Sequence, residues 1–208
     1  MRQKNFFSLV IKDSRLSFIT KILVISDFLI YSGFGLVDPF FAVFASEDIQ
    51  GGSLSVAGLS SSIYFIVYSL LMIPMARFID QKKGERDDFL VLIFGSFFIC
   101  LVPLLYLFAR YPWHIYLIQA LSGIGFSLAY ISWEAIFTRH IDKENVAFSW
   151  SIYETLTGLG GALAVGAGGV IIEFFGFRPL FLIAALIVFF GSSSLLFVAD
   201  KFKAVKQR

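Results

Sequence analysis

Two aspartates in the first long apolar stretch are the side chains with the clearest capacity for chemistry. Asp27 and Asp38 lie eleven residues apart. At about 100° per residue, this spacing is about 20° beyond three helical turns, so both lie on one stripe of a helix, with Tyr31 between them. A carboxylate in apolar surroundings can bind a proton, a cation or a hydrogen-bond donor of a solute. The alternatives are an aspartate paired inside a bundle and, for Asp38, a carboxylate hydrated near the outer end.

Proton binding is the more specific prediction for Asp27. No lysine or arginine lies at its depth in any apolar stretch, so protonation is the least costly way to satisfy the carboxylate in a closed state. We therefore expect a pH gradient to drive or modulate the activity of the protein.

A second stripe of polar and aromatic side chains lies between residues 114 and 138. It consists of Gln119, Ser122, Phe126, Tyr130 and Trp133, which follow helical spacing. Amide and aromatic groups on a concave wall suit a polar or amphipathic solute. An ordinary polar seam between two helices is the alternative.

The sequence lacks the residues that a metal site, a catalytic site or a phosphate-binding site would require. The single cysteine, Cys100, and two histidines expected at opposite membrane faces, His114 and His140, cannot form a metal site. No nucleophile–base pair or phosphate-binding loop is evident, so we expect neither an enzyme nor a cofactor. The net charge of +2 is divided between the two sides of the membrane and does not indicate nucleic-acid binding.

Six apolar stretches must position these residues. They span 17–45, 53–76, 89–109, 114–138, 147–174 and 179–199. Each is long enough to cross a hydrocarbon core of about 30 Å as a helix. Hydrophobic residues make up 58% of the chain, which includes 26 phenylalanines. This composition predicts an all-α integral membrane protein that contacts the lipid bilayer.

The basic residues predict the topology. One side of the membrane receives 15 of the 17: Arg2, Lys4, Lys12, Arg15, Lys21, Arg77, Lys82, Lys83, Arg86, Arg139, Lys143, Lys201, Lys203, Lys206 and Arg208. The other side has only Arg110 and Arg178. The positive-inside rule then places both termini in the cytoplasm, with the chain in the inner membrane. We expect a cytoplasmic or interfacial segment at 1–16, a six-helix domain at 17–199 and a basic tail at 200–208.

Four stretches resemble motifs of the major facilitator superfamily. The 2–3 connection reads Ala-Arg-Phe-Ile-Asp-Gln-Lys-Lys-Gly-Glu-Arg at 76–86, similar to Gly-x-x-x-Asp-Arg-x-Gly-Arg-Arg. The fourth stretch reads Gln-Ala-Leu-Ser-Gly-Ile-Gly at 119–125, similar to Arg-x-x-Gln-Gly-x-Gly. The fifth has a glycine-rich run at 160–169, similar to Gly-x-x-x-Gly-Pro-x-x-Gly-Gly, and Gly-Phe-Arg-Pro-x-Phe follows at 176–181.

The resemblance implies a six-helix bundle equivalent to one half of that family's fold, with a small-molecule solute moved by alternating access. The second half is expected from another copy of the chain, giving a homodimer about an axis along the membrane normal. Helices 1 and 4 would line the cavity, helices 2 and 5 the dimer interface, and helices 3 and 6 would face lipid. Two departures weaken a drug/proton antiport interpretation, since Gln119 replaces an arginine and Val165 a proline.

A cytoplasmic gate is expected around the 77–88 connection. The resemblance implies that Asp80 acts there as a latch, at a helix N-terminus or with a basic residue of the neighbouring half. Arg77 and Arg86 are the basic members, and we expect Glu134 to pair with one of them rather than to act in transport.

An inverted repeat is also predicted. Ser-Ile-Tyr at 62–64 recurs at 151–153, in helices that cross the membrane in opposite directions. The alternatives to a homodimeric transporter are a non-transporting scaffold, accessory or lipid-handling protein, and one half of a heterodimeric transporter.

Overall fold

The computed structural model describes residues 16–81 and 84–203. In this part of the chain all regular structure is helical, and six helical segments are long and apolar enough to cross a membrane. The first is composite, with α2 (Phe18–Val37), a 3-10 turn (Asp38–Phe40), α3 (Phe41–Val43) and a π turn (Phe44–Asp48). The next four are α4 (Leu54–Gln81), α5 (Glu85–Tyr106), α6 (Pro112–His140) and α7 (Val146–Phe175). The last joins α8 (Phe177–Ser194), a 3-10 turn (Leu195–Val198) and α9 (Ala199–Lys203).

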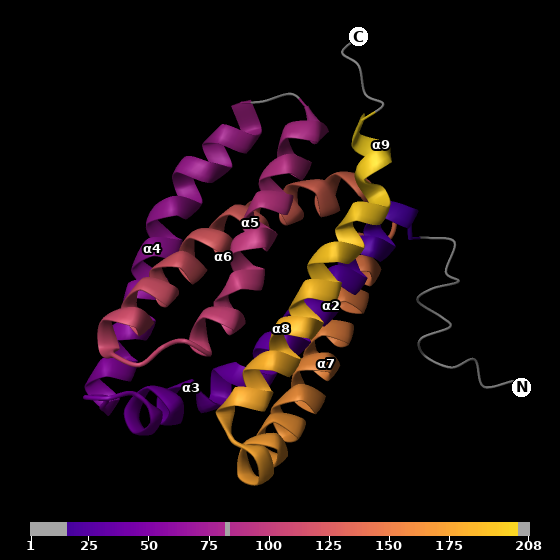
Figure 1. The fold of residues 1–208 in the computed structure, drawn as a ribbon. Helices are drawn as coiled ribbons and strands as arrows, with labels where there is room; N and C mark the ends of the chain where they lie inside the picture. Colours follow the sequence, from indigo (N-terminus) through magenta and orange to yellow (C-terminus); the bar gives the residue numbers. More distant parts are fainter. Residues whose placement is uncertain (1–15, 82–83, 204–208) are drawn as a thin grey trace, which may run out of the picture.

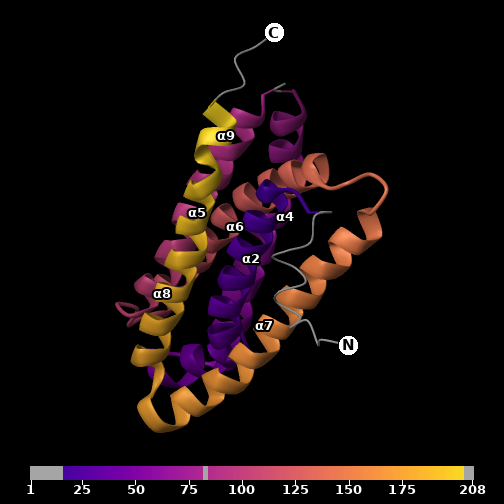
Figure 2. The ribbon, with the colours of Figure 1, turned by 90° about the vertical axis from the view of Figure 1, so that its right-hand side faces the viewer.

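The helices form two groups of three (Figure 1). In one group α6 packs against α4 and α5, and in the other α2 packs against α7 and α8. The groups meet mainly where α5 lies beside α8, as the rotated view also shows (Figure 2). The all-α six-helix fold class is therefore confirmed.

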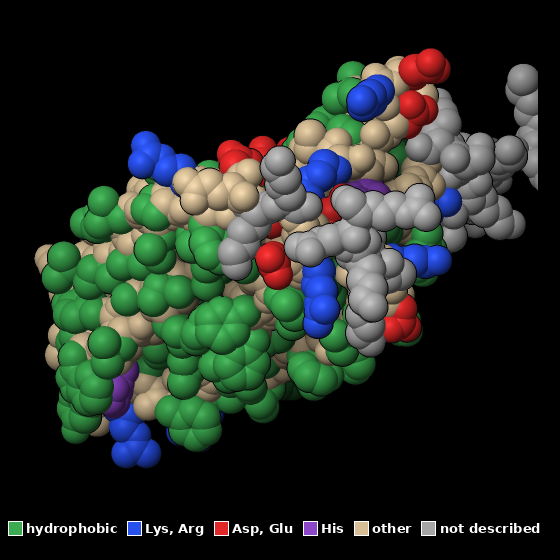
Figure 3. All heavy atoms as spheres, turned by 90° about the horizontal axis from the view of Figure 1, so that it is seen from above, with side chains coloured by type: hydrophobic (Ala, Val, Ile, Leu, Met, Phe, Trp, Pro, Cys, Tyr) green, Lys and Arg blue, Asp and Glu red, His purple; other side chains and the backbone are tan. Residues whose placement is uncertain are grey.

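One end of the bundle gathers charged groups, and we call it the basic end. The start of α2 and the end of α6 meet there, since Thr20 donates a hydrogen bond to the carbonyl of His140 (3.1 Å). The last helix, α9, lies beside the start of α5, since Phe202 stacks on Phe89 (4.6 Å between ring centres). Viewed from this end, acidic and basic side chains cluster among hydrophobic ones (Figure 3). At the opposite end, the backbone N–H of Gln50 donates a hydrogen bond to the backbone carbonyl of Arg110 (2.9 Å). Gly176 forms a turn at this end with a φ of 77°.

Close backbone approach holds the helices of each group together. A Cβ on Gly95 of α5 would lie 2.5 Å from the backbone nitrogen of Ala129 on α6. A Cβ on Gly33 of α2 would lie 2.5 Å from Val188 on α8. Glycine is needed at both positions because any side chain would force the helices apart.

The helices extend beyond the apolar stretches. Since α4 continues to Gln81 and α5 begins at Glu85, the gate residues Arg77, Asp80 and Arg86 lie on helices rather than in a long loop. The domain boundary expected at residue 199 falls inside a helical segment, because α9 continues to Lys203 and Phe202 is buried against Phe89. The amino-terminal segment up to residue 15 and the tail from residue 204 lie outside the described residues.

The first span changes its hydrogen-bond pattern at Pro39. Proline has no N–H to donate to the carbonyl one turn earlier, so the α-helix ends at Val37 and a 3-10 turn follows.

Candidate solute-binding site

A cavity of about 480 Å³, open on one side, lies between α2, α4 and α6. Its volume is within the range of small-molecule sites, about 300–1,000 Å³. The described residues that line it are Tyr31, Phe34, Asp38, Phe41, Ser61, Tyr64, Phe65, Tyr68, Tyr106, Gln119, Ser122, Phe126 and Tyr130. We call this space the aromatic cavity.

Six residues of the two predicted helical stripes meet in the aromatic cavity. They are Tyr31, Asp38, Gln119, Ser122, Phe126 and Tyr130. The rings of Phe34 and Phe126 lie 4.9 Å apart, edge to face, and join the two stripes across the cavity. The structure therefore brings these residues together on one wall of the cavity, and their role in solute binding stays a prediction.

The facing wall contains tyrosines that the sequence analysis missed. Tyr64 and Tyr68 lie one turn apart on α4, with stacked rings 5.8 Å apart, and Tyr106 comes from the end of α5. Tyr64 also approaches Phe126 of α6 at 6.1 Å. The available signal was two tyrosines four residues apart within an otherwise apolar stretch, where their hydroxyl groups require a polar neighbour.

Asp27 lines a separate, smaller cavity of about 20 Å³ beside the aromatic cavity, with Tyr31, Phe126 and Tyr130 shared between them. The hydroxyl of Tyr153, on α7, donates a hydrogen bond to Asp27 Oδ2 (3.2 Å). Two other lining residues, Ser26 and Ser96, have buried hydroxyls with no hydrogen-bond partner within the described residues. A space of this size can hold about one water molecule, and the oxygen atoms of Asp27, Ser26 and Ser96 are the polar partners that its largely apolar lining offers.

Trp133 does not line the aromatic cavity, contrary to its predicted pathway position. It is 2% exposed and reaches only the smaller cavity. Its ring stacks on Phe137 (4.6 Å), and its indole N–H donates to the carbonyl of Leu23 (3.2 Å). Because a buried indole requires an acceptor, this contact with α2 fixes the ring in the core.

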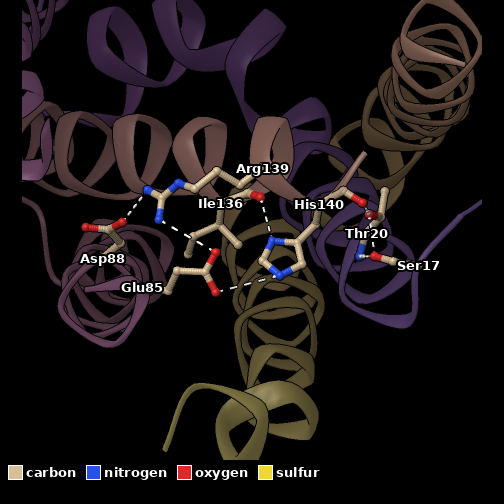
Figure 4. Close-up of polar contacts among 7 residues, drawn as sticks. All are labelled: Ser17, Thr20, Glu85, Asp88, Ile136, Arg139 and His140. Carbon is tan, nitrogen blue, oxygen red and sulfur yellow. Dashed lines mark hydrogen bonds and ion pairs between the residues drawn. The ribbon is translucent and has the colours of Figure 1, made fainter. Parts of the chain in front are cut away.

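A cluster of four ionisable side chains lies at the basic end (Figure 4). Arg139 of α6 donates to Asp88 and lies 3.8 Å from Glu85, both in the first turn of α5. His140 Nε2 lies 3.7 Å from the second carboxylate oxygen of Glu85. The Asp88 side chain is 1% exposed, so its charge depends on Arg139 for compensation.

This cluster takes the structural role that was expected of Glu134. In the described part of the chain, no ion pair joins Glu134 to Arg77 or Arg86, and the pairs at this end involve Arg139 and His140. The sequence signal was three acidic residues in the first turn of one helix and two basic residues in the last turn of another, where each sign matches the helix dipole.

No group of three potential metal ligands occurs among residues 16–81 and 84–203. The polar groups of the two cavities are instead suited to hydrogen bonding and to ion binding.

A family model described as Major Facilitator Superfamily matches residues 23–208. The chain belongs to the major facilitator superfamily. Membership in this superfamily and the six long apolar helical segments support a multi-pass membrane protein.

Curated relatives of this superfamily member include three proteins named "Multidrug resistance protein MdtG". The chain is 26% identical over 188 residues to the protein of Proteus mirabilis (strain HI4320), covering 87% of this chain and 45% of the relative. It is 27% identical over 167 residues to that of Salmonella choleraesuis (strain SC-B67), covering 78% and 40%. The protein of Enterobacter lignolyticus (strain SCF1) is 27% identical over 187 residues, covering 87% and 43%. The chain thus spans less than half the length of these relatives.

Proposed function

We propose that this superfamily member moves a small polar or amphipathic solute across the inner membrane by alternating access, as a homodimer of six-helix units. The observation that carries the proposal is the aromatic cavity, which is open on one side and places polar groups within the membrane-spanning region. A second copy related by an axis along the membrane normal would cover the open side.

The surface of α4 and α7 supports this arrangement. Only 11% of the α4 span and 22% of the α7 span are buried, compared with 39–44% for the other four. A Cβ on Gly58 of α4, or on Gly158 or Gly166 of α7, would meet no atom within 4 Å. Glycines on an uncovered membrane face permit close approach by another helix. Large aromatic residues that suit lipid, such as Phe94 of α5 and Phe189 of α8, are also exposed.

The order of helix packing supports an inverted repeat within each unit. The packing of α6 against α4 and α5 corresponds to that of α2 against α7 and α8. Each helix thus corresponds to the span three places further along the chain, α2 to α6, α4 to α7 and α5 to α8. Tyr64 and Tyr153, the last residues of the repeated Ser-Ile-Tyr, contribute to the aromatic cavity and to the Asp27 contact, respectively.

We propose that the basic end faces the cytoplasm. Arg77, Arg86, Arg139 and Lys143 occur there, whereas Arg110 and Arg178 lie at the opposite end, and this asymmetry follows the positive-inside rule. The side chains of Arg77, Asp80 and Arg86 are exposed and thus available for a gate contact with the second copy.

Liposomes made with the purified protein alone test the proposal. Solute flux supports a transporter that needs no other chain. A dimer without flux for any sugar, amino acid, nucleoside or drug tested would favour a scaffold or lipid-handling protein. Flux that requires a second, different chain would favour a heterodimer.

Gly166→Trp is expected to shift the protein from dimer to monomer without lowering its melting temperature. The indole would enter open space in one copy and block approach of the other. Native mass spectrometry in mild detergent measures the ratio of dimer to monomer. Leu182→Trp, on the exposed face of α8, is the matched control and should remain dimeric. A dimeric Gly166→Trp would place the interface elsewhere.

Asp27→Asn is expected to preserve solute exchange but abolish gradient-driven accumulation. We propose that a proton binds Asp27, and its hydrogen bond from Tyr153 and the adjoining room for one water molecule support this role. Flux into proteoliposomes is measured with and without a pH gradient. Asp142→Asn, in the connection after α6, is the control and should behave as wild type. Wild-type flux that is constant from about pH 5 to pH 8 would indicate a structural role for Asp27.

A further inference from the structure

A second polar cavity lies at the end of the bundle opposite the basic end. It has a volume of about 390 Å³ and lies where the π turn of the first span, the end of α5 and the start of α8 meet, at the lower end of the bundle in Figure 1. Its lining includes Arg110 and Arg178, together with Asp48 and Gln50. We call this space the arginine pocket. None of its lining residues comes from α4 or α7, so it is not part of the surface on which a second six-helix unit is proposed to pack.

The two arginines are free to bind a ligand. Both are exposed, and neither forms an ion pair within residues 16–81 and 84–203. Asp48 is also exposed and pairs with neither arginine, so two positive charges against one negative charge leave the lining with an excess of positive charge. A guanidinium group without a carboxylate partner can bind two phosphate oxygens through parallel hydrogen bonds.

The backbone of both arginines is held in place. The N–H of Arg110 donates a hydrogen bond to Nδ1 of His114 (3.0 Å), and its carbonyl accepts one from the N–H of Gln50 (2.9 Å). Arg178 lies in the first turn of α8, where no side chain caps the helix and the helix dipole adds partial positive charge. The arginine pocket is therefore a fixed electropositive site.

A cluster of aromatic rings lines the rest of the arginine pocket. The ring centre of Phe44 lies 5.8 Å from that of Tyr106, 5.3 Å from that of Phe177 and 4.8 Å from that of Phe181. All four rings contribute to the lining. A pocket with basic groups and an aromatic wall suits an amphipathic anion better than a fully hydrated ion.

An apolar groove adjoins the arginine pocket. Ala109 lines both spaces, and the groove, also of about 390 Å³, lies between the end of α5 and the start of α6. Phe108 and Leu117 in its lining are 74% and 61% exposed. Basic groups at the end of a membrane bundle, beside an apolar groove, match the two parts of a phospholipid, its phosphate and its acyl chain.

We propose that the arginine pocket binds the phosphate of an anionic glycerophospholipid, with one acyl chain in the groove beside Ala109. Arg110 and Arg178 donate hydrogen bonds to the phosphate oxygens. The excess positive charge favours an anionic headgroup over a zwitterionic one, and the groove favours a lipid over a free phosphate ester. The inference concerns a different cavity from the proposed solute-binding site and holds whether or not the protein transports a solute.

Native mass spectrometry of the purified full chain in mild detergent tests the inference. The chain is titrated with dioleoylphosphatidylglycerol and with dioleoylphosphatidylcholine, which has the same acyl chains on a zwitterionic headgroup. Saturable binding of the phosphatidylglycerol is expected, at least about 5-fold tighter than that of the phosphatidylcholine. Equal affinity for the two lipids, or tighter binding of dioleoylphosphatidylethanolamine, would overturn the anionic headgroup.

A soluble competitor separates a lipid site from a free phosphate site. Glycerol 3-phosphate carries the phosphate but no acyl chain, and at the concentration of the lipid it should not displace phosphatidylglycerol. Displacement at that concentration would overturn the lipid and assign the pocket to a free phosphate ester. Leu117→Trp, which fills the groove, should weaken phosphatidylglycerol binding about 5-fold, whereas Leu182→Trp, on the exposed face of α8, should not. Unchanged affinity in Leu117→Trp would overturn the acyl-chain position.

Charge variants locate the headgroup. Arg110→Gln and Arg178→Gln should each weaken phosphatidylglycerol binding about 5-fold, and the double variant about 25-fold. Arg110→Lys/Arg178→Lys keeps both charges, should retain most of the binding and controls for folding. Asp48→Asn should tighten binding, because it removes the negative charge of the lining.

A matched double variant at the basic end excludes an effect of net charge. Arg77→Gln/Arg86→Gln removes the same charge from the chain at two other exposed arginines and should change the affinity little, because they lie more than a screening length from the arginine pocket. If the two double glutamine variants weaken binding equally, the lipid follows the net charge of the protein and the assignment to Arg110 and Arg178 is overturned.

Discussion

Arg139→Met is expected to lower the free energy of unfolding by about 3 kcal/mol. Removing one partner of a fully buried ion pair typically costs about 3–5 kcal/mol, because the remaining charge has neither water nor a counter-ion. We place the effect at the low end because the Arg139 side chain is 38% exposed, which lets water reach its end of the pair. Asp88 itself is 1% exposed, and its Oδ1 has no hydrogen-bond partner among the described residues.

A denaturant titration in detergent micelles measures this loss, with three comparison variants. Arg139→Lys should recover part of the stability, since it keeps the positive charge but loses the planar guanidinium group that can donate two parallel hydrogen bonds. The double variant Arg139→Met/Asp88→Leu should recover more, because it removes both charges. Arg86→Met, at an exposed arginine in the first turn of α5, should change little. If Arg139→Met and Arg86→Met have equal stability, the pair with Asp88 contributes nothing.

Gly95→Ala is expected to have a similarly large effect, about 3 kcal/mol, at the upper end of the usual range for overpacking. The new methyl group would lie 2.5 Å from the nitrogen of Ala129 and 2.8 Å from the carbonyl oxygen of Gly125. Both are backbone atoms, so no side chain can rotate away and α5 must separate from α6. This separation would also open contacts around the small cavity, where α5 provides Ser96.

Gly158→Ala is the matched control in α7. Within one copy its methyl group would meet no atom within 4 Å, so helix propensity is the term that changes there, with a gain of up to about 1 kcal/mol. Melting temperatures of the two variants in one detergent provide the comparison. A Gly95→Ala protein as stable as Gly158→Ala would show that the helices are farther apart than described.

The six membrane helices could be predicted from sequence because length and apolar composition are properties of single segments. Their ends could not, since charged residues such as Arg77, Asp80 and Glu85 continue a helix once it leaves the hydrocarbon region. The stripe of Tyr31 and Asp38 was visible because polar residues mark one side of an apolar helix. Tyr106 gave no comparable signal, because the direction it faces depends on how α5 is rotated in the bundle.

The ion-pair cluster shows a different limit. Charge signs identified which helix ends attract one another, but not that Arg139 rather than Arg86 would reach Asp88. Side-chain reach across a helix–helix contact depends on the separation and crossing of α5 and α6. Those quantities depend on the close contact at Gly95 and Gly125, which lie about two and four helical turns from the charges on their own helices. The Glu134 pairing was predicted from proximity along the membrane normal alone, which does not fix a partner.

The two irregular turns in the first span affect the direction in which the following side chains point about the helix axis. A 3-10 segment is wound more tightly than an α-helix and a π segment more loosely, so the turns at Asp38–Phe40 and Phe44–Asp48 rotate the following residues in opposite senses. The two deviations act in opposite senses, and Val37, before the first turn, and Ile49, after the second, are both buried. The first span thus contains one overwound turn followed by one underwound turn. If the 3-10 turn lengthened while the π turn shortened, the outer end of the first span would rotate about the helix axis. The direction in which Asp38 points would change with it, while the inner part of α2 stays packed against α7 and α8.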